Sequence, residues 1–156
     1  MSETFEELRD LYQEVILDHG RHPRNFRRLD GALHAKGDNP MCGDKVEVWL
    51  KLGPGDRIED ASFQGRGCAI SVASASLMTE VLRGKTRDQA RSLADAFRTL
   101  ARTGACQVCG EMHAEDIERL QPLAGVAEYP SRVKCATLAW HAMEAALDGE
   151  GSATTE

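Results

Sequence analysis

The residues from 45 to 63 contain the pattern that most restricts the fold. Val46, Val48 and Leu50 alternate with more polar neighbours, which predicts a strand with one buried face. The sequence Gly53-Pro54-Gly55-Asp56 then predicts a turn, and the following residues, Ile58 to Phe63, predict a second strand antiparallel to the first. We therefore expect a small antiparallel sheet early in the chain.

Most of the remaining sequence has helical periodicity. Thr86 and Gln89 have the spacing of a capping box, which indicates that a helix begins there. Gly20 and Gly84 each follow an apolar periodic segment and are typical of helix ends. Apolar residues recur at helical spacing in five segments, namely 8–19, 69–83, 86–101, 115–120 and 130–147. The expected fold is α+β, with helices packed on one face of the sheet.

The length of 156 residues favours one domain, since no linker or internal repeat interrupts it. We expect this domain to span residues 1–148. The last eight residues, 149–156, are small or polar, and they predict a disordered C-terminal tail.

The charge of the chain restricts the classes of partner. The formal net charge is −6, which argues against non-specific binding of nucleic acid, because that binding depends on an excess of Lys and Arg. The sequence contains no long apolar run typical of a membrane span, and its acidic start is unlike a signal peptide. We expect a cytoplasmic protein. Thiols stay reduced there, so the five cysteines indicate metal or thiol chemistry rather than disulfides.

Three cysteines lie in settings that favour reactive thiolates. Cys42 lies in a short loop, two residues before Asp44. Cys68 follows Gly67 at a predicted strand-to-helix junction, and Cys135 lies in the predicted first turn of the last helix. The unpaired N–H groups and the dipole at a helix N-terminus stabilise a thiolate, which is the form that binds metal and attacks sulfur.

Three thiolates and the Asp44 carboxylate make a four-ligand set that suits tetrahedral Zn²⁺ or an iron–sulfur cluster. Zn²⁺ would neutralise two of their four negative charges, and Arg132 and Lys134 would offset the remainder. Taken alone, Cys68 or Cys135 is equally consistent with a small core residue. The long separations between the cysteines match no short zinc signature, so the residues alone do not show that they converge.

Three segments closely resemble the cysteine motifs of the IscU-like scaffold family of iron–sulfur cluster assembly, and the match is closer to its SufU branch. They are Asn39-Pro40-Met41-Cys42-Gly43-Asp44, Gly65-Arg66-Gly67-Cys68-Ala69-Ile70-Ser71 and Arg132-Val133-Lys134-Cys135-Ala136. The resemblance extends over about residues 5–148. Two features favour the SufU branch: Lys134 stands where IscU scaffolds usually have histidine, and residues 102–127 resemble an extra segment of SufU-type proteins.

The resemblance implies an α+β fold and a zinc ion held by Cys42, Asp44, Cys68 and Cys135. It also implies a SufS-like cysteine desulfurase as partner and a downstream cluster-assembly scaffold as sulfur acceptor. Our first hypothesis is a zinc-dependent sulfurtransferase in which Cys42 accepts persulfide sulfur, since its loop can move. The alternatives are a scaffold that assembles iron into a [2Fe–2S] cluster on the same residues, and a zinc ion that only stabilises the fold.

Cys106 and Cys109 form a Cys-x-x-Cys sequence outside the resembling motifs. Such a pair can act in redox chemistry or form half of a zinc site, and His113 could then supply a third ligand. The preceding residues predict a helix rather than the strand of a thioredoxin-like unit. We expect these two thiols to be spectators.

Overall fold

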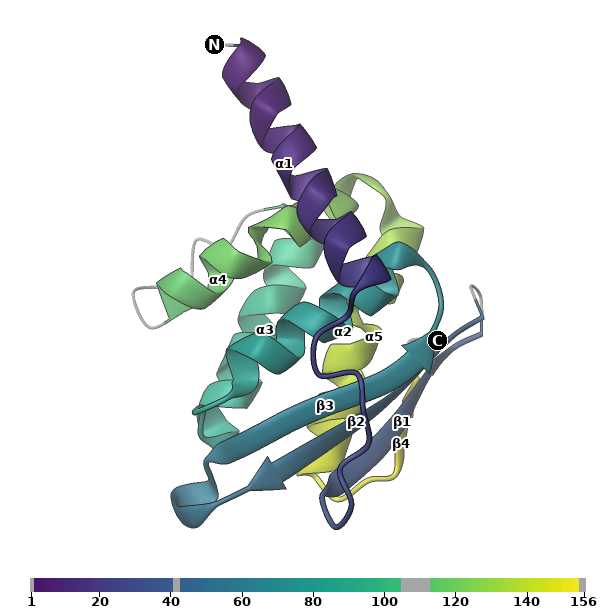
Figure 1. Ribbon diagram of the computed structural model, residues 1–156, viewed down its shortest axis with the longest axis vertical. Coiled ribbons are helices and arrows are strands. Elements are labelled where there is room, and N and C mark those ends of the chain that lie inside the picture. Colours follow the sequence, from purple (N-terminus) through teal and green to yellow (C-terminus); the bar gives the residue numbers. More distant parts are fainter. Residues whose placement is uncertain (1, 41–42, 105–112, 155–156) are drawn as a thin grey trace.

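The computed structural model describes residues 2–40, 43–104 and 113–154. It consists of one sheet and a layer of helices that covers one of its faces (Figure 1). The helices are α1 (Ser2–Arg21), α2 (Ala69–Leu82), α3 (Arg87–Thr103), α4 (Ala114–Leu120) and α5 (Pro130–Leu147). The strands are β1 (Leu33–Asn39), β2 (Asp44–Leu52), β3 (Ile58–Arg66) and β4 (Ser152–Thr154), and 3-10 turns occupy Pro54–Asp56 and Gln121–Glu128. The expected α+β class is confirmed.

The sheet has the strand order β3-β2-β1-β4. The predicted hairpin is present, with β2 antiparallel to both β3 and β1. The apolar pattern does not predict β1, because its sequence is mostly polar or small. Packing explains this composition at Gly37, where an added Cβ would lie only 3.2 Å from Leu138 and 3.3 Å from Ala142 of α5. The glycine lets α5 lie close against β1.

The core lies between the sheet and the helices α2, α3 and α5. Val46, Val48 and Leu50 of β2 are buried, as their alternation predicts. Trp140 of α5 stacks on Phe97 of α3 at 4.6 Å between ring centroids, and its Nε1 donates to Ser74 Oγ of α2. This contact links the three helices, so the starts of α2 and α5 are held at one end of the sheet.

Local signals account for the helix boundaries. The capping box predicted at Thr86 is present, with reciprocal hydrogen bonds to Gln89.

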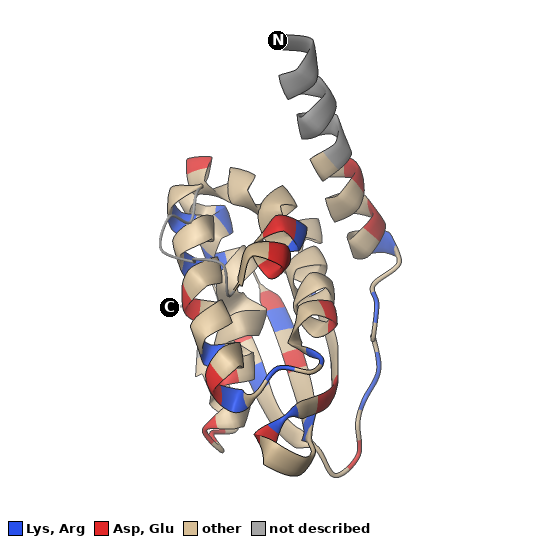
Figure 2. Cartoon of the chain, turned by 90° about the vertical axis from the view of Figure 1, so that its left-hand side faces the viewer, with Lys and Arg blue, Asp and Glu red and all other residues tan. Residues whose placement is uncertain are grey.

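The connector between α1 and β1 carries several basic residues (Figure 2). Two of them are used within the chain, since Arg24 pairs with Asp18 and Arg27 pairs with Asp60. None of the described helices combines the length and hydropathy that crossing a bilayer requires.

The prediction of a disordered tail is wrong for residues 152–154, which form the strand β4. β4 pairs in parallel with β1, with Lys36 opposite Ser152 and Asp38 opposite Thr154. The Lys36 N–H also donates to the Gly151 carbonyl at 3.0 Å. The open edge of β1 supplies hydrogen-bond partners to a segment whose own sequence has little strand propensity. Tertiary pairing therefore overrides the local composition.

Candidate metal centre

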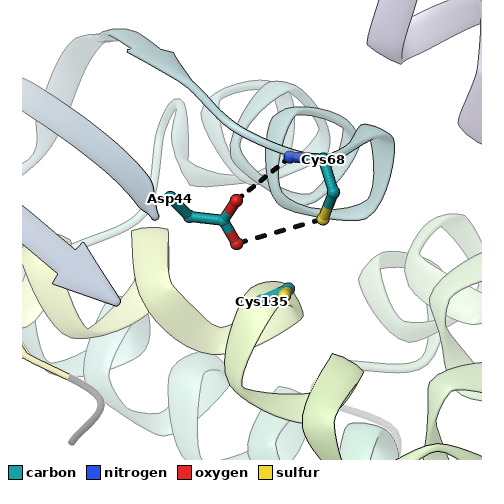
Figure 3. A group of neighbouring side chains, drawn as sticks. All are labelled: Asp44, Cys68 and Cys135. Atoms are coloured by element: carbon teal, nitrogen blue, oxygen red, sulfur yellow. Dashed lines mark hydrogen bonds between the residues drawn. The ribbon is translucent and has the colours of Figure 1, made fainter. Parts of the chain in front are cut away.

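Asp44 is the first residue of β2 and pairs with Asn39 at the end of β1. Its side chain is buried, and both carboxylate oxygens are directed toward Cys68 (Figure 3). Oδ1 accepts the Cys68 backbone N–H at 3.0 Å, and Oδ2 lies 3.9 Å from Cys68 Sγ. The β1–β2 hairpin therefore places a carboxylate beside the start of α2.

Gly67 makes this approach possible. A Cβ at this position would lie 2.3 Å from Asp44 Oδ1, and the backbone φ is +156°. Any side chain here would displace the carboxylate from the Cys68 N–H. The glycine that precedes Cys68 is therefore required by the site and not only by the turn.

Cys68 is the N-cap residue of α2, as the sequence predicts. Its backbone is extended, with φ −70° and ψ 164°, and its Sγ accepts the Ser71 N–H at 3.4 Å. A sulfur in this position faces the N–H groups of the first turn of α2, of which it accepts the one from Ser71. Cys68 is partly exposed.

Cys135 lies in the second turn of α5 rather than the first, because the helix begins at Pro130. The prediction that a helix N-terminus activates this thiol is therefore wrong. Cys135 is 0% exposed, and its Sγ lies 3.7 Å from the Ser131 carbonyl and 3.9 Å from Asn39 Nδ2. Its setting is determined by neighbouring polar groups and by burial.

Asp44, Cys68 and Cys135 converge, although long stretches of sequence separate them (Figure 3). One donor atom from each lies within 4.8 Å of the other two. Ligands of a tetrahedral Zn²⁺ would be roughly 3.5–3.8 Å apart, given Zn–S of about 2.3 Å and Zn–O of about 2.0 Å. Small side-chain movements would close this difference, so the donor set fits a metal ion.

One basic side chain, Arg132, interacts with both described thiols. Cys68 raises the pKa of the Arg132 guanidinium through its charge, and Cys135 adds to this effect by hydrogen bonding. Arg132 is therefore the basic residue that faces the thiols. Lys134 is exposed and takes part in none of the ion pairs found among the described residues.

The remaining candidates are placed only in part. Cys42, Cys106 and Cys109 lie outside the described residues. His113 is buried, and its Nε2 lies 2.8 Å from Ser92 Oγ. The role of these cysteines therefore stays a prediction.

Sequence reasoning misses one polar residue of the site, Asn39. Its side chain is fully buried and contacts Cys135. A polar residue that ends a strand immediately before Pro40 is ordinarily interpreted as part of a turn, so no local pattern indicates this contact. Only its place in the first cysteine motif marks it.

Comparison with known proteins shows to which family the chain belongs. Residues 11–136 match the family described as the NifU-like N terminal domain. The chain belongs to this family. The resemblance to IscU-like scaffold proteins, including the SufU branch, is confirmed.

Curated relatives carry two different functional names. The chain is 42% identical over 134 residues to the "Zinc-dependent sulfurtransferase SufU" of Bacillus subtilis (strain 168), covering 86% of this chain and 87% of that protein. It is 38% identical over 146 residues to the "Iron-sulfur cluster assembly scaffold protein IscU" of Streptococcus pyogenes serotype M1, covering 94% of this chain and 88% of that protein.

A solved structure supports the fold. It is the crystal structure of a putative iron–sulfur cluster assembly scaffold protein for the SUF system from Fervidobacterium islandicum AW-1, with a TM-score of 0.74 and 31% identity. The match covers 86% of this chain and 94% of that one. The chain is therefore a member of the SufU and IscU group of iron–sulfur cluster assembly proteins.

Proposed function

We propose that this chain is a zinc-dependent sulfurtransferase of iron–sulfur cluster assembly, which accepts persulfide sulfur on Cys42. The observation that carries the proposal is the convergence of Asp44, Cys68 and Cys135 within 4.8 Å. Three protein donors leave one position of a tetrahedral site for a fourth ligand. The name of the Bacillus subtilis relative supports zinc as the metal.

Cys42 is the proposed fourth ligand and the sulfur acceptor. It is two residues from Asp44, so the chain keeps the two Cα atoms within about 7 Å. The ends of its loop are held together by the Asn39–Asp44 pair and by the Gly43 N–H, which donates to the Asn39 carbonyl at 2.9 Å. These contacts bring together the two ends of the connection in which Cys42 falls in the sequence, and both ends adjoin the convergent donors.

Burial separates the three cysteines by accessibility. Cys135 is 0% exposed and is held within a helix, so a persulfide on a partner protein cannot reach its sulfur without opening the fold. Cys68 is fixed at the start of α2 and its sulfur accepts a backbone N–H. In the sequence Cys42 falls between the end of β1 and the start of β2 and not within a helix, which favours it as the acceptor.

The proposed transfer needs no external oxidant or reductant. The Cys42 thiolate attacks the outer sulfur of a desulfurase persulfide and forms a new S–S bond. The S–S bond of the donor breaks, and the donor cysteine leaves as a thiolate. The proton on the transferred sulfur stays with it, so Cys42 now carries the persulfide. A downstream cluster-assembly scaffold would then receive this sulfur.

Bound zinc would keep its cysteine ligands deprotonated at neutral pH. The chain's own residues perform the other tasks. Asp44 supplies the oxygen donor, and Arg132 compensates the negative charge of the thiolates. The partner that fits this chemistry is a cysteine desulfurase of the SufS class in the cytoplasm.

The second candidate is a scaffold that assembles a [2Fe–2S] cluster on the same residues. The name of the Streptococcus pyogenes relative supports it. Lys134, which stands where IscU scaffolds usually have histidine, argues against it. Protein isolated without added metal distinguishes the two: zinc in colourless protein supports the transferase, whereas iron in brown protein supports the scaffold.

Mass spectrometry tests the sulfur acceptor. The zinc-loaded protein is incubated with a cysteine desulfurase and cysteine, and persulfides are then trapped by alkylation and mapped. We expect the added sulfur on Cys42, no sulfur on Cys42→Ala, and normal loading of the control variant Cys106→Ser. Sulfur mapped to Cys135, with Cys42→Ala fully competent, would contradict the assignment.

A further inference from the structure

We infer that Asn39 is a positioning residue of the metal site, which holds the Cys135 sulfur as a thiolate ligand through an amide hydrogen bond. The inference rests on the proposed metal-binding function, because it concerns the same donor set. It adds a residue that touches a proposed ligand and is not itself a ligand.

The Asn39 side chain lies in the interior of the protein, next to Cys135. Asn39 is the last residue of β1 and is 0% exposed. Its Nδ2 lies 3.9 Å from Cys135 Sγ, within the range of a long N–H···S hydrogen bond. Its Oδ1 is also buried and has no hydrogen-bond partner in the part of the chain that the structure describes.

The burial of the Asn39 amide has an energetic cost. A buried amide oxygen without a partner destabilises the folded state, whereas an apolar side chain of similar shape does not. The amide nitrogen gains in return a contact of 3.9 Å with the Cys135 sulfur. Packing therefore does not explain the residue, and unsatisfied buried polar groups of this kind need a functional explanation.

The hydrogen bonds of the Cys135 sulfur change when it becomes a metal ligand. The Cys135 thiol donates toward the Ser131 carbonyl at 3.7 Å, and a metal-bound thiolate has no proton for that bond. The Asn39 N–H remains as a donor, and a hydrogen bond to an ionised acceptor is shorter and stronger than one to a neutral group. It would also reduce the repulsion between the anionic ligands.

The backbone of Asn39 links the other parts of the site. Asn39 pairs with Asp44 across the hairpin, and its carbonyl accepts the Gly43 N–H at 2.9 Å. One residue thus contacts the strand with the carboxylate, the loop with Cys42 and the helix with Cys135. Groups that orient metal ligands in this way typically contribute 10–100-fold to metal affinity.

The test compares Asn39→Leu, which has a similar shape, with Asn39→Ala, which cannot clash. Zinc dissociation constants are measured by competition with a chelating dye, and thermal midpoints are measured without metal. We expect both variants to bind zinc about 10–100-fold more weakly. Asn39→Leu should nevertheless keep or raise the midpoint of the metal-free protein, because it removes the unpaired oxygen.

Ser62→Ala is the matched control. Ser62 is also 0% exposed with an unpartnered Oγ among the described residues, but it lies opposite Trp49 in the middle of the sheet. It should leave zinc affinity unchanged. Cobalt-loaded protein gives a second readout, since loss of the N–H···S bond should shift the sulfur-to-cobalt absorption band in the Asn39 variants and not in Ser62→Ala.

Wild-type zinc affinity and an unshifted cobalt band in both Asn39 variants would overturn the inference and leave the proposed function intact. Weaker zinc binding by Asn39→Leu together with a lower thermal midpoint of the metal-free variant would also overturn it, since that result describes a purely structural role. A wild-type protein that binds no zinc would overturn both proposals.

Discussion

The two described cysteines of the site are held by different physical means. Cys68 caps the N-terminus of α2, where its sulfur accepts the Ser71 N–H and its backbone N–H donates to Asp44. Cys135 lies one turn inside α5, where the backbone N–H groups are already paired, and it is completely buried. The Cys68 sulfur thus accepts from a backbone N–H at the start of α2, whereas the donors that approach the Cys135 sulfur are the side chains of Asn39 and Arg132.

This difference predicts which neighbours matter at each cysteine. The surroundings of Cys68 depend on the backbone, because Gly67 and the first turn of α2 determine where the sulfur and the Asp44 carboxylate lie. The surroundings of Cys135 depend on Asn39 and Arg132, which a single substitution removes. The following predictions test this contrast.

The largest effect is expected from removing either cysteine. Cys68→Ala and Cys135→Ala should each lose the stabilisation that zinc confers, which is about 4 kcal/mol when free metal is 1,000 times its dissociation constant. Metal binding is coupled to folding, so the loss appears as a smaller zinc-dependent rise in the thermal midpoint. Differential scanning calorimetry with and without zinc measures it.

Without metal, the two variants should differ. Cys68→Ala loses an N-cap, which costs about 1 kcal/mol, and Cys135→Ala leaves a small buried cavity. A full zinc-dependent rise in either variant would show that its sulfur is not a ligand.

A backbone change at the start of α2 should have the next largest effect. Gly67→Ala places a Cβ against Asp44 Oδ1, so the carboxylate must move away from the Cys68 N–H. We expect roughly 10–100-fold weaker zinc binding, as for other groups that orient ligands, and behaviour similar to Asp44→Ala. Isothermal titration with zinc measures the change.

Gly84→Ala is the control for the backbone cost alone. Gly84 has φ +83°, and nothing lies within 4 Å of an added Cβ. This variant should lose stability, by about 1–3 kcal/mol, without a change in zinc affinity. Equal zinc affinities for Gly67→Ala and wild type would show that Asp44 does not need this approach.

The charge next to Cys135 should have a smaller effect. Arg132→Ala should weaken zinc binding roughly two- to fivefold at low ionic strength and less at high salt, because the exposed guanidinium is screened. Lys134→Ala should change the affinity less, because Arg132 interacts with both thiols, whereas no such interaction of Lys134 is found among the described residues. Equal changes in zinc affinity for Arg132→Ala and Lys134→Ala would show that Arg132 has no special role beside the thiols.

The smallest effect is expected from the Cys-x-x-Cys sequence. Changing Cys106 and Cys109 together to serine should leave zinc content and desulfurase stimulation nearly unchanged, because both lie outside the cysteine motifs. Metal analysis and a desulfurase assay on the double variant measure this. Loss of either property would assign a function to this segment.

The sequence predicts the elements that have strong local signals. Alternation in β2, the capping box at Thr86 and the apolar periodicity of α2 and α5 each reflect a physical preference of the local chain. It does not predict β1 or β4, because Gly37 and Ser152 acquire their strand pairing from neighbours distant in sequence. Local preference and tertiary pairing thus divide the predictable from the unpredictable part of the sheet.

The candidate site shows the same division. Cys68 at a helix start follows from its preceding glycine and the periodicity that comes after it. The convergence with Cys135 follows only from resemblance, since no local rule joins residues so far apart. Asn39 is missed because its role depends on a contact with α5, and contacts across the core leave no periodic signal in the sequence.

The central claim is that the convergent donors hold one metal ion together with Cys42. X-ray absorption at the zinc edge of protein isolated without added metal tests it most directly. We expect one zinc per chain with three sulfur neighbours at about 2.3 Å and one oxygen neighbour at about 2.0–2.2 Å. In Asp44→Ala the sulfur neighbours should remain while the Asp44 oxygen is lost. Zinc surrounded only by oxygen or nitrogen, or the same spectrum after removal of Cys68 or Cys135, would contradict it.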